Sequence, residues 1–259
     1  MLTFIGLGLY DDESITVEGR AALDDADRVF AEFYTSHLVG ATVEDLEVAH
    51  GVDIEVRDRA GVEQEPDDIL AAAEDDHIAF LTAGDTMIST THVDLRLRAI
   101  DRGIDTRVIH GVTAQTAASG LTGLQNYRFG KSVTLPFPDA HGGDDVPGSV
   151  IESIEANRTR GLHTLVYLDI TADRDAYMTA DAAAELLVEA WTDTLGVAVA
   201  RAGSPDPVVA GDSLSALAER EFGDPLHLLV VPGDLHYVES DALAALGGAP
   251  EGVLAPRER

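Results

Sequence analysis

The sequence contains no cysteine and a single lysine, Lys131, among its 259 residues. The absence of cysteine excludes a disulfide scaffold, a zinc–thiolate site, an iron–sulfur cluster and a cysteine nucleophile. The nine histidines form no H-x₃-H or H-E-x-x-H pattern, so no metal site is expected. A G-x-S-x-G nucleophile elbow and a complete Walker A loop are also missing. No run of about 18 uncharged apolar residues is present, so no membrane span is expected.

Positive charge is scarce as well, because 17 Lys plus Arg stand against 47 Asp plus Glu, giving a formal net charge of −30. We therefore expect neither nucleic acid nor an anionic membrane as a partner. The chain is nevertheless 45% hydrophobic, which argues against the disorder typical of acidic chains that lack hydrophobic residues. The acids are spread along the chain, and at about 1 M salt a Debye length of about 3 Å screens their repulsion.

This composition predicts a cytoplasmic protein of an extreme halophile, and the alternative is an acidic protein of a mesophile. The first residues, Met1–Ile5, enter a strand pattern with no basic segment before them, so no targeting signal is expected.

Short apolar runs alternate with helical patterns along the chain, which predicts an α/β fold with a mostly parallel sheet in the first half. In the second half, two strand patterns are separated only by the turn 203–206, which predicts antiparallel pairing in a mixed sheet. We expect two α/β domains, residues 1–112 and 113–259. The expected strands are Leu2–Leu9, Arg28–Glu32, Asp53–Val56, His77–Thr82, Thr106–His110, His163–Asp169, Gly196–Ala202, Pro207–Ala210 and Leu226–Val231. The expected helices are Thr16–Ala26, Asp67–Glu74, Thr91–Arg102, Thr113–Gly120, Val150–Arg160, Ala180–Trp191, Ser213–Glu221 and Val238–Leu246.

The first expected strand ends in a Gly6-Leu7-Gly8 turn. Paired glycines allow the backbone to approach a ligand or a second loop closely. A dinucleotide-binding fingerprint would have a third glycine where Asp11 stands, and the acids that follow would repel a phosphate. The sequence therefore disfavours an NAD-dependent oxidoreductase.

A second strand end leads into Gly84-Asp85 and a polar run. Loops at the carboxyl ends of strands are where open α/β sheets bind ligands. Two interpretations are open for Asp85: its carboxylate accepts hydrogen bonds from ligand hydroxyls or an amine, or it shapes the turn while Thr90 or Thr91 caps the following helix.

Two further strand ends carry the same ambiguity. After Val108–His110, backbone N–H groups could face a ligand, or Thr113 could simply be the N-cap of the next helix. Near the C-terminus, His236 either binds or orients a ligand or lies at the start of a helix as a capping residue.

Taken together, these segments resemble the diphthine synthase branch of the class III, tetrapyrrole-methylase-like, S-adenosylmethionine-dependent methyltransferases. The resemblance covers nearly the whole chain and includes the segments FIGLGLYDDESIT, FLTAGDTMISTTHVDLRLRA, RVIHGVTAQTA and LHLLVVPGDLHYVE. The wider family has a Gly-rich start ending in Pro-Gly-Asp and a Gly-Asp-Pro loop. This chain has Gly-Leu-Gly-Leu-Tyr-Asp and Gly-Asp-Thr instead, which separates it from corrin and sirohaem methylases.

The resemblance implies a tetrapyrrole methylase-like fold of two α/β domains, with S-adenosylmethionine in the cleft between them, in a homodimer. It implies three methyl transfers to the amino group of 2-(3-amino-3-carboxypropyl)histidine on translation elongation factor 2, in diphthamide biosynthesis, with S-adenosylhomocysteine as the second product. No catalytic base is assigned. By position in the family, the cofactor contacts are expected at Leu9, Asp85, Ile88, Thr113, Ala114, Leu168, Ala210 and His236.

Two alternatives to this activity remain. A precorrin- or uroporphyrinogen-type tetrapyrrole C-methyltransferase would bind an acidic macrocycle and should present Arg-rich walls, whereas few Arg lie near these loops. A regulatory protein of the same fold would bind S-adenosylmethionine and transfer nothing.

Overall fold

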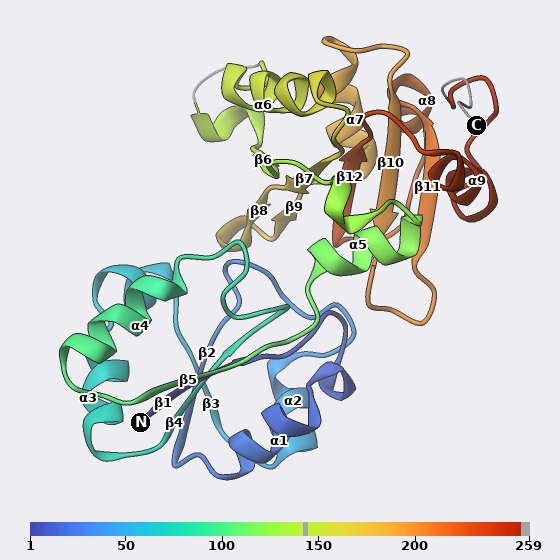
Figure 1. The fold of residues 1–259 in the computed structure, drawn as a ribbon. Helices are drawn as coiled ribbons and strands as arrows, with labels where there is room; N and C mark the ends of the chain where they lie inside the picture. The colour runs from blue at the N-terminus through green and yellow to red at the C-terminus, as the bar shows by residue number, and fades with distance from the viewer. Residues whose placement is uncertain (142–144, 255–259) are drawn as a thin grey trace. The chain divides into compact units, whose positions relative to one another are not determined.

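The computed structural model describes residues 1–141 and 145–254, which form two compact units (Figure 1). The first unit consists of Met1–Ala114 together with Ala172–Arg174. The second unit consists of Gln115–Thr171 and the chain from Asp175 onward.

The first unit contains a five-stranded parallel sheet with the strand order β3-β2-β4-β1-β5. The parallel sheet predicted from the alternating pattern is thus confirmed. Its strands are β1 (Leu2–Gly6), β2 (Arg28–Glu32), β3 (Ile54–Val56), β4 (Ile78–Thr82) and β5 (Thr106–Ile109). Its helices are α1 (Val17–Asp24), α2 (Val43–His50), α3 (Asp67–Asp75) and α4 (His92–Asp101).

Both faces of this sheet are buried, because successive side chains of a strand point to opposite faces. Phe4, Phe30 and Phe80 pack with the residues of α3 and α4 on one face. Ile5 and Leu81 pack with α1 and α2 on the other. The near-continuous apolar runs of the sequence are explained by this three-layer arrangement, which Figure 1 shows.

The second unit contains a mixed five-stranded sheet with the strand order β11-β10-β12-β7-β6. Only β6 and β7 pair in parallel. The hairpin predicted around the turn 203–206 is confirmed, because β10 and β11 pair antiparallel with Ala198 opposite Ala210. The strands are β6 (Val133–Leu135), β7 (Thr164–Leu168), β10 (Leu195–Ala200), β11 (Val208–Ser213) and β12 (His227–Val231), and a separate pair is formed by β8 (Ile170–Thr171) and β9 (Ala176–Tyr177).

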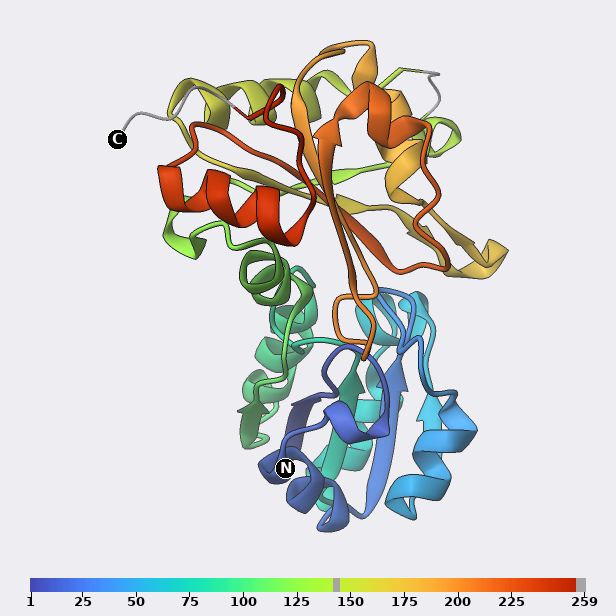
Figure 2. The same cartoon turned by 90° about the vertical axis from the view of Figure 1, so that its right-hand side faces the viewer.

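Helices cover both faces of the second sheet (Figures 1 and 2). One face packs its core against α6, α7 and α8. The other face carries α5 and α9, and Tyr167 of β7 donates a hydrogen bond to Gln115 of α5. The helices are α5 (Ala114–Thr122), α6 (Gly148–Thr159), α7 (Ala180–Val188), α8 (Leu214–Ala218) and α9 (Tyr237–Leu246).

Helix α2 was not expected from the sequence pattern. Only Leu46 and His50 of its eight residues are buried, so its apolar periodicity is weak. Its start depends instead on a capping box, in which Thr42 and Asp45 bond each other's backbone N–H groups.

Among the residues that the structure describes, no helix is long and apolar enough to cross a membrane, and no cluster of His, Asp and Glu could hold a metal ion.

Candidate functional site

The strands β1, β4 and β5 end at the same edge of the first sheet, because they are parallel neighbours. Their loops meet there through glycine backbone: Gly8 and Gly84 exchange hydrogen bonds of 3.1 and 2.6 Å. A Cβ on Gly6 would lie 2.6 Å from both the Gly84 carbonyl oxygen and the Gly111 nitrogen. The turn Gly6-Leu7-Gly8 therefore allows the loops at Gly84 and Gly111 to approach closely. Close approach of a second loop was one of the two roles expected for this turn, and approach of a ligand was the other.

Asp85 joins the loops of this edge with both of its carboxylate oxygens. Oδ1 accepts a hydrogen bond from the Met87 N–H at 2.8 Å. Oδ2 accepts from the Gly111 N–H at 3.2 Å and lies 2.8 Å from the donating Nδ1 of His110. Asp85 thus shapes the turn, as one of its two interpretations predicted, and a contact between Asp85 and a ligand stays a prediction.

The N-cap position of α4 is Thr91, but its side chain caps nothing. The Thr91 hydroxyl donates instead to Glu63 at 3.0 Å, so the expected side-chain cap at this residue is wrong. Thr113 lies directly before α5, as expected for an N-cap position.

A buried pair lies beneath the Asp85–Thr91 loop. The His92 Nδ1 donates to the Thr86 carbonyl at 3.0 Å, and its Nε2 lies 3.4 Å from Oε1 of Glu32. Burial raises the pKa of Glu32, although hydrogen bonds from Thr35 act in the opposite direction. Burial also lowers the pKa of His92. The hydrogen bond from His92 to the Thr86 carbonyl fixes the loop to this pair.

The loop itself has several features that suit a ligand site. Ser89 has a left-handed backbone with φ of 58°, a conformation that costs energy in residues other than glycine. Ile88 is 41% exposed. The Thr90 hydroxyl is buried and has no hydrogen-bond partner within the described part of the chain, although buried polar groups are nearly always paired. Gly84 has open space where a Cβ would stand.

The structure brings together the expected site residues of the first unit. Leu9, Asp85 and Ile88 follow the Gly8–Gly84 contact, and Thr113 and Ala114 follow β5 at the same edge. All of them are partly or largely buried except Ile88. A single loop cluster therefore carries five of the eight positions.

The second unit places its three expected residues differently. Leu168, at the end of β7, and Ala210, within β11, are 7% and 1% exposed and pack in the core beside α6, α7 and α8. Their side chains are core residues, so a ligand would meet only their backbone. His236 is exposed at the N-cap of α9, and its Nδ1 accepts a hydrogen bond from the Val238 N–H at 3.4 Å, as the capping interpretation predicted.

Leu168 and His236 are not neighbours. Val231 of β12 lies opposite Thr164, the first residue of β7, and the chain continues outward from there to His236. Leu168 lies at the other end of β7, roughly 13 Å along the strand at about 3.3 Å per residue. A ligand that touches both would have to extend along the sheet.

Three buried or half-buried residues around the β12–α9 loop were not singled out from the sequence. Glu239 and His163 are fully buried, and their side chains lie 3.1 Å apart. Arg128 lies 3.2 Å from Glu239. The available signal was Glu239, three residues after the N-cap position, where a capping-box acid is typical.

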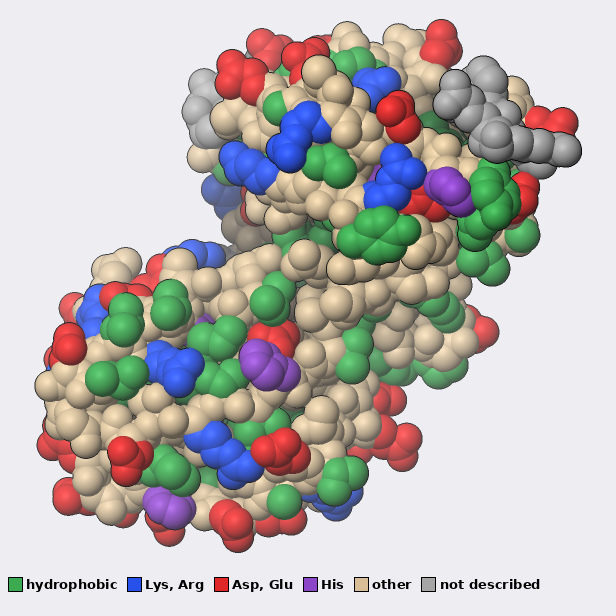
Figure 3. Space-filling model, viewed as in Figure 1, with side chains coloured by type: hydrophobic (Ala, Val, Ile, Leu, Met, Phe, Trp, Pro, Cys, Tyr) green, Lys and Arg blue, Asp and Glu red, His purple; other side chains and the backbone are tan. Residues whose placement is uncertain are grey.

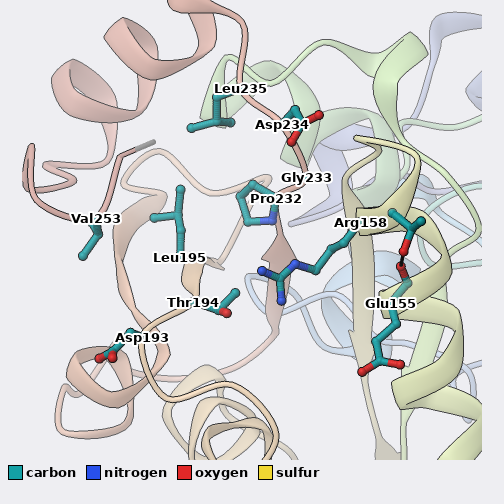
Figure 4. Close-up of a pocket in the computed structure, with 11 residues that line it drawn as sticks. Glu155, Arg158, Asp193, Thr194, Leu195, Pro232, Gly233, Asp234, Leu235 and Val253 are labelled. Carbon is teal, nitrogen blue, oxygen red and sulfur yellow. Dashed lines mark hydrogen bonds between the residues drawn. The ribbon is translucent and has the colours of Figure 1, made fainter. Parts of the chain in front are cut away.

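A cavity of about 600 Å³ lies in the second unit at the end of β12 (Figure 4). Arg158 projects into it from α6, and Pro232, Gly233 and Asp234 form another part of its wall. None of the eight expected cofactor contacts lines it. It is therefore a separate feature from the loop cluster of the first unit.

Comparison with known proteins gives consistent results. The family model of the Tetrapyrrole (Corrin/Porphyrin) Methylases matches residues 1–218. A diphthine synthase of Halorubrum lacusprofundi is 75% identical over 259 residues, covering 96% of this chain and 98% of that protein. A diphthine synthase of Methanococcoides burtonii is 48% identical over 264 residues, covering 98% of both chains. The crystal structure of a diphthine synthase aligns with a TM-score of 0.91 at 37% identity, covering 97% of this chain and 98% of that chain.

Proposed function

The chain belongs to the tetrapyrrole methylase family and, within it, to the diphthine synthases, and we propose that it methylates the amino group of 2-(3-amino-3-carboxypropyl)histidine on translation elongation factor 2. It is an S-adenosylmethionine-dependent methyltransferase with the tetrapyrrole methylase fold. The observation that carries the proposal is the 75% identity to a diphthine synthase over nearly the full length of both chains. These matches over nearly the full length of the chain favour this activity over that of a tetrapyrrole C-methyltransferase.

The residues of the first unit fit an S-adenosylmethionine molecule. The unpartnered Thr90 hydroxyl offers a polar contact, Ile88 offers an apolar one, and Gly84 leaves room for a ligand beside its backbone. We propose Leu9, Asp85, Ile88, Thr113 and Ala114 as contacts here, with Leu168, Ala210 and His236 in the second unit. Leu168 and Ala210 would contribute their backbone.

When bound, S-adenosylmethionine supplies an electrophilic methyl group on a sulfonium. The chain must then hold the acceptor nitrogen about 3–3.5 Å from that methyl carbon, so positioning provides much of the rate. The acceptor amine must also be unprotonated, although a lysine-like amine has a pKa near 10. The Asp85 carboxylate has three protein donors within reach, which makes it a support of the site and a poor candidate for the base.

The remaining features of the proposal come from the family resemblance. We propose three successive methyl transfers, S-adenosylhomocysteine as the second product, and a homodimer as the working form. Translation factors act on ribosomes, so the proposed place of action is the cytoplasm. The relatives from haloarchaea and the net charge of −30 support a cytoplasm of high salt.

A methyl-transfer assay tests the proposal. Radiolabelled S-adenosylmethionine is incubated with the protein in about 2 M KCl, where exposed charges are strongly screened. Elongation factor 2 that carries the aminocarboxypropyl-histidine is the substrate, and unmodified factor is the control. Label on the modified factor alone supports the proposal, and mass spectrometry of the labelled peptide counts the methyl groups.

Two other outcomes would redirect the assignment. Cofactor binding without label on the factor would favour a tetrapyrrole substrate or a binder without transferase activity. A folded protein that binds no S-adenosylmethionine would contradict the proposed reaction altogether.

A further inference from the structure

The loop of residues 85–91 joins β4 to α4 and carries a polar atom that lacks a partner. The Thr90 hydroxyl is buried and bonds no atom in the described part of the chain, although buried polar groups are nearly always paired. Beside it, Ile88 is exposed and Ser89 has a left-handed backbone. A ligand at this edge of the first sheet would give the Thr90 hydroxyl a partner.

His92, the first residue of α4, bonds this loop from its buried side. The His92 side chain is fully buried, and Nδ1 lies 3.0 Å from the Thr86 carbonyl oxygen. A carbonyl oxygen can only accept, so Nδ1 carries a proton and donates it. Thr86 is buried as well, and its hydroxyl accepts from Thr82 of β4 at 3.5 Å. The first part of the loop is thus bonded to β4 and to α4.

Two neighbours fix the orientation of the His92 ring. Phe80 of β4 packs edge-on against it, with the ring centroids 5.1 Å apart. Oε1 of Glu32 lies 3.4 Å from Nε2 on the other side of the ring. Glu32 is held in turn, because its two carboxylate oxygens accept from the N–H and the hydroxyl of Thr35 at 3.0 and 2.5 Å. The core of the first sheet therefore directs Nδ1 of His92 at the loop.

The other end of the loop is bonded separately. The Thr91 hydroxyl donates to Glu63 at 3.0 Å, and Arg59 also donates to Glu63, at 3.2 Å. Thr90 lies between this bond and the bond at Thr86. Loops are ordinarily more mobile than the elements they join, so bonds at both ends indicate a loop that keeps one conformation before any ligand binds.

We propose that His92 is a positioning residue, which holds the Thr86 carbonyl so that the loop 85–91 presents Ile88 and the Thr90 hydroxyl to the bound cofactor. The inference rests on the proposed function, because it takes S-adenosylmethionine as the ligand of this loop. A loop held in its bound conformation saves the ordering cost that a free loop would have to meet on binding. His92 itself is buried and touches no ligand in this scheme.

The test measures the Kd of S-adenosylhomocysteine by calorimetry in about 2 M KCl, where surface charges are screened. In His92→Phe, the ring and its edge contact with Phe80 remain, but the Thr86 carbonyl loses its donor. The loop must then be ordered when the ligand binds. We expect the Kd to rise roughly three- to tenfold, which corresponds to the loss of one hydrogen bond.

His92→Asn separates the hydrogen bond from the packing of the ring. The asparagine amide can donate from the place of Nδ1, but the smaller side chain leaves space beside Phe80. We therefore expect a lower thermal midpoint with a Kd within about twofold of the wild-type value. Affinity would then follow the bond to Thr86, whereas a merely structural role would make it follow stability.

Thr90→Val tests whether His92 acts through the loop. Valine has the shape of threonine without the hydroxyl, so the loss of its bond to the ligand should raise the Kd. Because His92 positions this hydroxyl, the rise should be smaller when Thr90→Val is introduced into His92→Phe. Such non-additivity is the mark of a coupled pair.

The matched control is His50→Phe. His50 is buried in the same unit, at the end of α2, and neither of its ring nitrogens has a hydrogen-bond partner among the described residues. The same substitution there removes a buried histidine without releasing a loop. It should leave the Kd unchanged.

The outcomes separate the inference from the proposed function. Wild-type binding with an unchanged Kd in folded His92→Phe overturns the inference alone, and so does His92→Asn that binds as weakly as His92→Phe. An unchanged Kd in Thr90→Val, additive losses in the double variant, or an equal loss in His50→Phe also overturns it. Absence of binding by the folded wild-type protein overturns the proposed function, and the inference with it.

Discussion

Nδ1 of His110 lies 2.8 Å from Oδ2 of Asp85, and this contact joins the end of β5 to the turn after β4. The Asp85 side chain is 3% exposed, whereas that of His110 is 72% exposed. Asp85 also accepts from the backbone of Met87 and Gly111. A single carboxylate therefore holds the loops that carry the proposed cofactor contacts of the first unit.

Replacement of this carboxylate by an amide should weaken cofactor binding. In Asp85→Asn, the amide nitrogen would face the donors of His110 and Gly111 or that of Met87, so at least one charge-assisted hydrogen bond is lost. Such bonds contribute about 1.5–3 kcal/mol each, so we expect the Kd of S-adenosylhomocysteine to rise by about ten- to a hundredfold. Calorimetry at high salt measures the change.

The matched control is Asp45→Asn. Asp45 also bonds a backbone N–H and a hydroxyl of Thr42, but it does so at the start of α2, within a capping box. This variant should bind S-adenosylhomocysteine as the wild-type protein does. Equal affinities for Asp85→Asn and the wild-type protein would show that Asp85 has no part in the site.

Gly6 lies at the end of β1, where the backbone of Gly84 and Gly111 approaches it closely, so no side chain should be tolerated at this position. In Gly6→Ala, the new Cβ would meet two backbone atoms at 2.6 Å, and backbone cannot move aside cheaply. Overpacking of this kind costs about 1–3 kcal/mol, and we expect the upper end of that range. Chemical denaturation at fixed salt measures the free energy of unfolding.

Gly120→Ala provides the comparison, because nothing lies within 4 Å of a Cβ at Gly120 in helix α5. There the added methyl group should stabilise the protein by roughly 0.5–1 kcal/mol, since glycine loses more conformational freedom in a helix than alanine does. Equal stabilities of the two variants would contradict the close approach at Gly6.

Stability should decrease as the solution becomes mildly acidic. His227 is buried, with Nδ1 accepting from the Ala180 N–H and Nε2 donating to the Asp224 carbonyl, and burial lowers its pKa. Below about pH 6.5 the His227 side chain binds a proton in the unfolded chain but stays neutral in the folded one. The free energy of unfolding therefore decreases as the pH decreases. Buried His163 acts in the same direction, whereas Glu32, whose pKa is raised by burial, acts in the opposite one.

Thermal unfolding between about pH 7.5 and pH 5.5 tests this sign. In His227→Asn, the amide oxygen can still accept from Ala180 but the group does not titrate, so the loss of stability over this interval should be smaller than in the wild-type protein. His77→Asn, at an exposed position, controls for the removal of a histidine. A wild-type midpoint that rises toward pH 5.5 would refute the argument.

Folding should depend on molar salt. Acidic side chains are spread over the visible face of both units (Figure 3), and the 17 Lys and Arg residues are too few to pair with 47 acids. Exposed pairs such as Arg28–Glu55, whose side chains are 42% and 38% exposed, stabilise little. In dilute buffer the self-repulsion should unfold the protein, and about 2 M KCl should restore the structure by screening.

Circular dichroism during a KCl titration measures the transition. Sucrose strengthens the burial of apolar surface without screening charge, so it should restore less structure than KCl does. A thermal midpoint that is the same in dilute buffer and in 2 M KCl would rule out screening as the source of stability.

Local patterns predicted much of the fold. The strand Arg28–Glu32 was expected with the bounds that the structure has. The hairpin of β10 and β11 followed from the short turn between two apolar runs. Helix α2 was missed because few of its side chains reach the core, so the periodicity that reveals a helix is weak there.

The site could be predicted only as a set of loops. Each strand end showed its glycine and polar residues in the sequence, and the family resemblance supplied the residue positions. The partners of Asp85 and Glu239 were not predictable, because His110 is 25 residues from Asp85 and Gln125 is 114 residues from Glu239. No local pattern encodes contacts at such separations.

By itself, the sequence determined the α/β class, the antiparallel hairpin and the acidity, because periodicity, turn residues and composition act within a few residues. Its motifs carried the family resemblance. Only the tertiary structure decided that Asp85 ties two loops together, that Leu168 and Ala210 are core residues, and that Glu239 collects four donors. The reason is that these facts depend on which strands become neighbours and in which register, and that choice is made by packing of the whole unit.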